Sequence, residues 1–246
     1  MKKIFISGAG GYIGSNLATF LSKKNYYLFC LTTKKKIRLK NTKWIVGKMS
    51  HNCAKYLKKS DLLIHCAAAG VYKKESKKNL NKVNYLDSIN LLKNAYECGC
   101  KNWIILGSSF EYGFIKNKPL SAKKTKIKPI DDYGKSKVRL FKAIKKLEFS
   151  RSCRILYLRV FHVFGGNEPK KRMYPSLLRA LKNNSFFKMT NGEEIRDFIH
   201  IDNVVKKIQS SFKMFNNKNF FKIKHLASGK KMSVKDFAKK IREFKR

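Results

Sequence analysis

The sequence predicts an α/β fold in which a doubly wound parallel sheet is followed by a small C-terminal α/β lobe. Two observations indicate this class. Short apolar strands alternate with helical segments through the first half of the 246 residues, which is typical of a parallel sheet with helices on both faces. A glycine-rich loop, residues 7–15, joins the first expected strand to the first expected helix. A chain of this length can bury a core as one large domain, or as one domain with a small lobe.

The expected strands are runs of apolar residues, and the expected helices show apolar residues at intervals of three and four. Strands are expected at 4–6, 26–31, 44–46, 62–66 and 103–106, and helical segments at 15–23, 54–59, 81–98, 133–147 and 172–183. The helix over 81–98 is expected to bury one broad face formed by Leu86, Ile89, Leu91, Leu92 and Ala95. We expect a first domain over 1–162 and a small lobe over 163–246 that packs partly back on it.

Composition argues against several classes of protein. The chain is 43% hydrophobic and 13% aromatic, as folded globular proteins are. Its sequence has no apolar run of the length that a membrane span needs, and Met1 to Lys3 are interpreted as the beginning of a strand instead of a signal peptide. Six cysteines show no Cys-x-x-Cys spacing. We expect reduced thiols, a cytoplasmic location and no metal site.

The formal net charge of +42 raises the question of nucleic-acid binding. The lysines are spread over the whole chain, and only ten of the 57 basic residues are arginine, the residue that base and phosphate readers favour. A general drift toward A/T-rich codons explains this composition better than nucleic-acid binding does. The charge would still attract acidic substrates such as nucleotides.

The glycine loop has the context of a dinucleotide site. Gly8, Gly11 and Gly14 lie between a strand and a helix, where glycines let the backbone approach a pyrophosphate at the helix N-terminus. Their spacing is one residue longer than the ordinary Gly-x-Gly-x-x-Gly pattern. The loop therefore predicts a Rossmann-type NAD(P)-binding domain over residues 1–162.

The end of the second strand bears on the choice of cofactor. A domain that selects NAD usually has an acidic residue there for the ribose 2′-hydroxyl. This strand ends in Thr32, Thr33 and Lys34, and no acidic residue occurs between residues 15 and 60. Hydroxyls and cations suit a 2′-phosphate, so NADP is favoured. NAD stays the alternative, because only 15 acidic residues occur in the whole chain.

A set of three residues indicates the chemistry. Ser108 follows an expected strand, and Tyr133 and Lys137 are four residues apart on one helix face. A phenol with a pKa near 10 carries protons poorly at neutral pH, but a neighbouring ammonium stabilises the phenolate. With Ser108 placing a carbonyl or alcohol oxygen, Tyr133 would move its proton during hydride transfer.

Together these motifs resemble the extended short-chain dehydrogenase/reductase family, in its NAD-dependent epimerase/dehydratase group acting on nucleotide sugars. The matching segments run through nearly the whole chain and keep the order of the family. They are residues 8–14, 61–68, 84, 108–113, 133–137, 158–161, 164–165, 196–202, 226–229 and 233–234.

The resemblance implies roles for individual residues. Ser108, Tyr133 and Lys137 would be catalytic, and Ser109, His162 and Arg196 would bind substrate, with Arg196 on its diphosphate. The cofactor would be bound by Gly8, Gly11, Tyr12, Ile13, Gly14, Thr32, Thr33, Lys34, Ala67, Ala68, Asn84, Tyr133, Lys137 and Phe161. For Arg159 and Asp202, pairing with other residues of the protein is at least as good an interpretation as a functional role. Glu111 would face either substrate or solvent.

Departures from the family pattern narrow the activity. Ser109 and Phe110 stand where 4,6-dehydratases carry an Asp-Glu pair, which argues against elimination of water. Lys48 stands where relatives often have an acidic residue near adenine, and His162 replaces a usual asparagine. His162 would be a substrate hydrogen-bond donor, an acid/base group or a variant positioning residue. Residues 110–113 are most similar to nucleotide-sugar 4-ketoreductases such as CDP-abequose synthases, which use NADPH.

The sequence thus leaves three functions open. The first is reduction of a 4-keto-6-deoxy sugar nucleotide, with Tyr133 as general acid. The second is an NAD-dependent nucleotide-sugar 4-epimerase, and the third is a non-catalytic cofactor- or nucleic-acid-binding derivative of the fold. The resemblance also implies a homodimer, and the C-terminal lobe is expected to be shorter than in the family.

Overall fold

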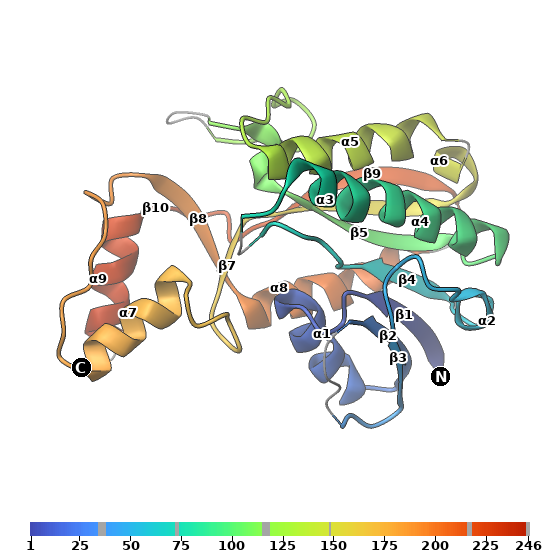
Figure 1. The fold of residues 1–246 in the computed structure, drawn as a ribbon, viewed down its shortest axis with the longest axis horizontal. Coiled ribbons are helices and arrows are strands. Elements are labelled where there is room, and N and C mark those ends of the chain that lie inside the picture. Colours follow the sequence, from blue (N-terminus) through green and yellow to red (C-terminus); the bar gives the residue numbers. More distant parts are fainter. Residues whose placement is uncertain (34–37, 72–73, 115–118, 148, 216–217, 245–246) are drawn as a thin grey trace.

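A seven-stranded parallel sheet forms the centre of the part of the chain that the computed structural model describes: residues 1–33, 38–71, 74–114, 119–147, 149–215 and 218–244 (Figure 1). Every neighbouring pair is parallel. The strand order is β3-β2-β1-β4-β5-β6-β9. The strands are β1 (Lys2–Ser7), β2 (Tyr26–Thr32), β3 (Thr42–Val46), β4 (Leu62–His65), β5 (Asn102–Ser108), β6 (Arg154–Val160) and β9 (Phe220–Leu226).

Helices cover both faces of this sheet, and each face has its own apolar core. On one face α1 (Tyr12–Ser22) packs against α8 (Ile201–Ser210). On the other lie the short α2 (Ala54–Leu57), α3 (Lys77–Asn81), the π-helical η1 (Lys82–Asp87), α4 (Ser88–Glu97) and α5 (Asp132–Lys146) (Figure 1). The central strands are buried on both faces, as their continuous apolar sequences require. The predicted Rossmann-type fold is confirmed.

A smaller layer lies beyond one end of the sheet (Figure 1). Its strands are ordered β10-β8-β7, with β7 (His162–Phe164) parallel and β10 (Lys231–Ser233) antiparallel to β8 (Ile195–His200). The helices α7 (Met173–Lys182) and α9 (Val234–Phe244) pack beside it. Between β8 and β10 the chain returns to the large sheet as α8 and β9, with η3 (Ser211–Met214) between them. The division at residue 162 stays a prediction.

The helix expected over 81–98 differs from its prediction. Its residues 82–87 form the π-helical turn η1, and the hydroxyl of Ser88, which follows this turn, donates to the Val83 carbonyl oxygen at 2.9 Å. The wider turn shifts the phase of the helix faces. Leu86, expected in the buried face, is therefore 47% exposed, whereas Asn84 is buried. The remaining described elements are α6 (Phe149–Ser152) and the 3₁₀ turn η2 (Ser109–Tyr112).

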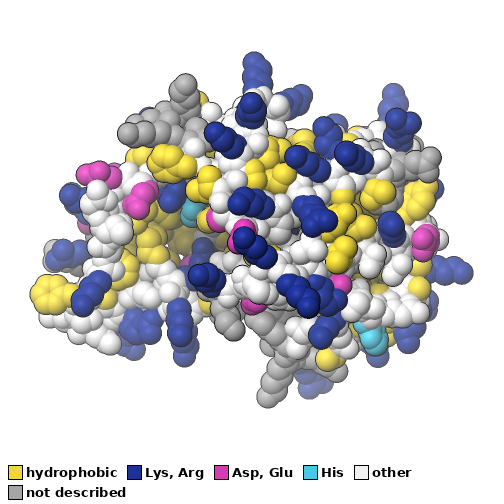
Figure 2. All heavy atoms as spheres, turned by 45° about the horizontal axis from the view of Figure 1, so that its top comes forward, with side chains coloured by type: hydrophobic (Ala, Val, Ile, Leu, Met, Phe, Trp, Pro, Cys, Tyr) yellow, Lys and Arg dark blue, Asp and Glu magenta, His cyan; other side chains and the backbone are white. Residues whose placement is uncertain are grey.

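Three properties of the described residues bear on partners and on redox state. No helix among them combines the length and apolar character that a crossing of the bilayer requires. Lysine and arginine side chains are scattered over the face drawn in Figure 2 instead of forming a single stripe. The six cysteines are free thiols, and burial raises the pKa of Cys30 to about 12.

Candidate active site

The glycine-rich segment 7–15, which joins β1 to the first turn of α1, packs too tightly for side chains at two of its positions. Gly8 has a φ of +70°, and a Cβ there would lie 2.6 Å from the backbone nitrogen of Ala67. A Cβ on Gly14 would lie 2.2 Å from the carbonyl oxygen of Gly8. The loop therefore presents bare backbone at the N-terminus of α1, which is what a pyrophosphate needs.

We expect Gly14→Ala to lower the free energy of unfolding by ~1–3 kcal/mol, the usual cost of overpacking. Elsewhere in a helix the same change would stabilise by about 0.5–1 kcal/mol, because alanine restricts the unfolded chain more. The measurement is urea denaturation, with Thr19→Ala on the same helix as the control. A stability equal to wild type would show that the loop tolerates a side chain.

A cavity of about 820 Å³ runs from this loop along the carboxyl ends of the strands to the N-terminus of α5. It reaches both halves of the expected site, since the glycine loop and the residues expected to be catalytic share its wall. The expected residues that line it are Gly8, Gly11, Tyr12, Ile13, Gly14, Thr32, Thr33, Ala67, Ala68, Ser108, Ser109, Tyr133, Lys137, Phe161 and His162. The cavity is lined by the backbone of the glycine loop and by apolar side chains, which suits a dinucleotide.

Ser108 ends β5 and begins the turn η2, where its hydroxyl accepts a hydrogen bond from the Phe110 amide at 3.2 Å. The Phe110 ring contacts the Tyr133 ring edge to face, with 5.9 Å between centroids. A Cβ on Gly134 would lie 2.5 Å from the Phe110 carbonyl oxygen, so glycine lets the two segments meet. The turn thereby holds Ser108 and Tyr133 on one side of the cavity.

Lys137 is only 2% exposed although it lines the cavity. Burial lowers its pKa from the ordinary value to about 8, while the negative charge of Glu111 acts in the opposite direction. A buried ammonium responds strongly to a neighbouring charge, because the protein interior screens charges less than water does. It lies one helical turn beyond Tyr133 on α5, as the sequence predicts.

Three expected residues lie elsewhere. Asn84 stands behind the cavity wall: it accepts from the Ala69 amide at 2.7 Å and donates to the Ser136 hydroxyl at 2.9 Å. It therefore fixes the loop after β4 against α5. Arg196 lines a second, smaller cavity of about 160 Å³. Lys34 lies outside the described residues.

His162 lines both cavities, so it lies between the expected cofactor side and Arg196. Among the described residues its Nδ1 atom is buried with no hydrogen-bond partner. Burial, and then the charges of Arg196 and Arg172, lower the pKa of His162 to about 4. The imidazole is therefore neutral at physiological pH and suits hydrogen bonding better than proton donation.

The wall around the end of β2 carries no carboxylate from β2 itself. Thr33 and Lys48 line the cavity there, and Thr32 is buried. The acidic residues that do line the cavity are Glu75, Asp87, Asp131 and Asp132, from α3, η1, α5 and their flanking loops.

Sequence reasoning missed two charged pairs. Glu111 was expected to face substrate or solvent, and both expectations are wrong: it is fully buried and its Oε2 accepts from Arg159 Nε at 2.7 Å. Arg172, expected only to begin a helix, lines both cavities and pairs with Glu168 at 3.1 Å. The internal pairing left open for Arg159 is present. Glu168 and Arg172 are four residues apart, a spacing that could have suggested their pairing, whereas no local pattern marks the pairing of Glu111 with Arg159.

The fold and the site together are those of a Rossmann-type nucleotide-binding protein, in which a serine, a tyrosine and a lysine line the same cavity as the glycine loop. The model of the NAD-dependent epimerase/dehydratase family matches residues 4–219, and the chain belongs to that family. The family resemblance found in the sequence is confirmed.

Individual relatives are distant. The chain is 26% identical to the GDP-6-deoxy-D-talose 4-dehydrogenase of Aggregatibacter actinomycetemcomitans over 81% of its own length and 66% of that protein's. It is 23% identical to the CDP-abequose synthase of Salmonella typhimurium, over 95% of its length and 78% of the relative's. It thus spans less than two thirds of some of the relatives it matches, among them 57% of a mouse sterol-4-alpha-carboxylate 3-dehydrogenase.

Solved structures agree on the fold. The UDP-N-acetylglucosamine 4-epimerase of Methanobrevibacter ruminantium M1, solved with UDP-N-acetylmuramic acid, superposes with a TM-score of 0.86 at 22% identity, covering 98% of this chain and 81% of that one. MoeE5, solved with UDP-glucuronic acid and NAD, gives a TM-score of 0.86 at 20% identity over 98% and 82%. At these identities the likeness extends to the fold alone.

Proposed function

We propose that this protein is an NADP-dependent reductase of a nucleotide-linked 4-keto-6-deoxy sugar, with Ser108, Tyr133 and Lys137 as its catalytic residues. The observation that carries the proposal is the single cavity that the glycine loop shares with these three side chains. The similarity to a CDP-abequose synthase over 95% of the chain supports it. The proposed location is the cytoplasm and the proposed assembly a homodimer.

When bound, NADPH supplies the hydride. Ser108 holds the ketone oxygen of the sugar by a hydrogen bond, and Tyr133 gives that oxygen its proton. The Lys137 ammonium lowers the free energy of the Tyr133 phenolate that remains and also binds the nicotinamide ribose. The glycine loop, with Tyr12 and Ile13, binds the pyrophosphate.

NADP is proposed over NAD because of the end of β2. Thr33 and Lys48 line the cavity there, so a 2′-phosphate would meet a hydroxyl and a cation. NAD is the alternative, since MoeE5 was solved with NAD. Titrating the protein with NADPH and NADH by fluorescence decides between them: tighter binding of NADH would overturn the NADP assignment.

The sugar nucleotide is proposed to lie toward the smaller cavity. Arg196 lines it together with Arg172, and planar guanidinium groups pair well with a diphosphate. His162 lines the same cavity and would hydrogen-bond the sugar. Ser109, beside Ser108, would contact the sugar from the cofactor side.

The test is incubation of the purified protein with NADPH and dTDP- or CDP-4-keto-6-deoxyglucose, following the loss of NADPH absorbance. Oxidation of NADPH that depends on the keto sugar is the expected result. Absence of turnover with either sugar, together with epimerisation of a UDP-hexose, would reject the reductase.

A second candidate is an NAD-dependent nucleotide-sugar 4-epimerase, favoured by the similarity to UDP-glucose 4-epimerases of 24–26% identity. Such an enzyme retains its cofactor through the cycle and consumes none. Mass spectrometry of the cofactor that remains bound after gentle purification separates the two: retained NAD favours the epimerase. A non-catalytic derivative would show neither activity and no effect of changing Tyr133.

A further inference from the structure

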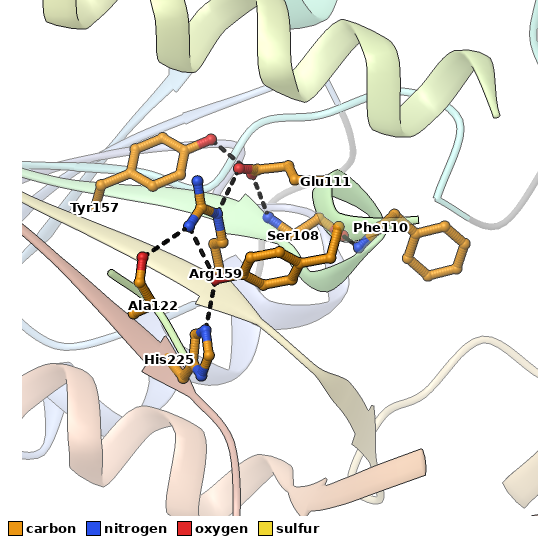
Figure 3. Close-up of polar contacts among 8 residues, drawn as sticks. Ser108, Phe110, Glu111, Ala122, Tyr157, Arg159 and His225 are labelled. Atoms are coloured by element: carbon orange, nitrogen blue, oxygen red, sulfur yellow. Dashed lines mark hydrogen bonds and ion pairs between the residues drawn. The ribbon is translucent and has the colours of Figure 1, made fainter. Parts of the chain in front are cut away.

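A buried network of polar groups lies directly behind Ser108 (Figure 3). Its centre is the fully buried Glu111 carboxylate, which accepts from the Ser108 amide at 2.8 Å, the Tyr157 hydroxyl at 2.7 Å and Arg159 Nε at 2.7 Å. Arg159 donates to the Tyr112 hydroxyl at 2.9 Å, which lies 2.6 Å from His225 Nε2. The chemistry proposed above assigns no role to these groups.

The carboxylate holds the turn that carries Ser108. Glu111 and Ser108 form a reciprocal capping box on η2, and the Phe110 ring points away from the network (Figure 3). A Cβ on Gly107 would lie 2.5 Å from Glu111 Oε1, so the strand can pass the carboxylate only as glycine. The network thereby fixes the backbone of β5 where it reaches the cavity.

The same network packs under the face of α5 that carries Lys137. Phe141, one helical turn beyond Lys137, lies 4.9 Å from the Tyr157 ring and 4.8 Å from the Arg159 guanidinium, measured to ring centroids. The turn η2 and α5 are in contact along this side. The negative charge of Glu111 acts strongly on the buried Lys137 ammonium, because the protein interior screens charges less than water does.

We propose that Glu111 is a positioning residue for the catalytic set: its carboxylate fixes the Ser108 turn and supplies the negative charge that keeps the buried Lys137 ammonium protonated. The catalytic consequence rests on the proposed function, whereas the effect on Lys137 itself does not.

Among the described residues, Cys66 and His65 at the end of β4 are also electrostatically coupled to Lys137, and neither replaces this charge. Arg159, paired with Glu111, is positive and acts against the lysine charge. Burial raises the pKa of Cys66 to about 12, so the thiol is neutral. Burial, and then the charge of Lys137, lower the pKa of His65 to about 3, so the imidazole is neutral as well. Its two ring nitrogens lie 2.7 Å from Ser7 Oγ and 3.0 Å from Ser88 Oγ.

The direction of the effect follows. Burial disfavours the charged lysine and Glu111 favours it, so removal of the carboxylate charge lowers the Lys137 pKa further. The lysine then loses its proton at a lower pH and no longer stabilises the Tyr133 phenolate. The alkaline limb of the activity profile moves to lower pH, and activity falls more above neutral pH than below it.

The test is NMR titration of the whole protein with isotopically labelled lysine, the Lys137 signal being assigned by its loss in Lys137→Met. We expect Glu111→Gln to lower the Lys137 pKa from about 8 to about 7, a typical effect of one nearby charge. The control is Glu168→Gln, the same change at a buried, arginine-paired carboxylate of the small lobe. It should leave the Lys137 pKa unchanged, and Glu111→Asp, which keeps the charge, should lower it less than Glu111→Gln.

Glu111→Gln leaves Arg159 unpaired in the core and risks unfolding, so Glu111→Gln/Arg159→Met removes both charges together. Removing Arg159 also removes a positive charge that opposes the Lys137 ammonium, so the double variant is compared with Arg159→Met, from which it differs only at Glu111. A lower Lys137 pKa in the double variant than in Arg159→Met supports the proposal. Equal Lys137 pKa values in these two variants, or a wild-type pKa in a folded Glu111→Gln, overturn it. The measurement needs neither cofactor nor substrate, so it separates this proposal from the proposed function, which fails instead if the wild type shows no turnover.

Discussion

Replacing Tyr133 by phenylalanine is expected to lower the turnover of a keto sugar nucleotide by about 10²- to 10⁴-fold, the usual contribution of one general acid. The ring contact of Tyr133 with Phe110 needs no hydroxyl and survives the change. The apolar and backbone walls of the cavity are also unchanged. Binding of NADPH should therefore stay within a few-fold of wild type, and the whole loss should fall on kcat.

The measurement is steady-state turnover of the wild type, of Tyr133→Phe and of a control variant, together with fluorescence titration of NADPH. Tyr85→Phe is a suitable control, because the Tyr85 ring lies on η1 and stacks with the Arg139 guanidinium through its face. It should turn over like the wild type. If Tyr133→Phe also turned over like the wild type, Tyr133 would not be the proton donor and the catalytic assignment would fall.

The parts of the site that could be predicted are those set by local sequence. The glycine loop follows from three glycines between one strand and one helix, and the Tyr133–Lys137 pair follows from helical spacing. Both sit at the carboxyl ends of parallel strands, where this fold binds its ligands. A short motif therefore also predicts where its residues lie in the fold.

The parts that could not be predicted depend on residues far apart in the chain. Glu111 and Arg159 are 48 positions apart and meet only because β5 and β6 are neighbours in the sheet. Asn84 turns inward, and Leu86 outward, because η1 is a π-helical turn, whose phase differs from the ordinary helix assumed from the apolar pattern. The signs of the charges do not show which distant residues pair, and the periodicity of apolar residues does not show where a helix contains a π-helical turn.

The second large effect is expected from Arg159→Met, which should lower the free energy of unfolding by ~3–5 kcal/mol. The Arg159 side chain is 1% exposed and its partner Glu111 is fully buried. Methionine fills much of the same volume but leaves the carboxylate without its counter-ion. An unpaired charge in the core is far costlier than the pair itself.

Urea denaturation of the single variant and of Glu111→Gln/Arg159→Met tests this reasoning. The double variant should recover much of the lost stability, since no charge is left unpaired, so the two substitutions should be strongly non-additive. Arg172→Met is the matched control. The Arg172 side chain, paired with Glu168, is 28% exposed, and solvent screening should make the decrease in the free energy of unfolding smaller. If the effects of the two core substitutions simply added, Glu111 and Arg159 would contribute to stability independently. The interaction between Glu111 and Arg159 would then not account for the fixed Ser108 turn, and it would not explain why both charged residues lie in the core.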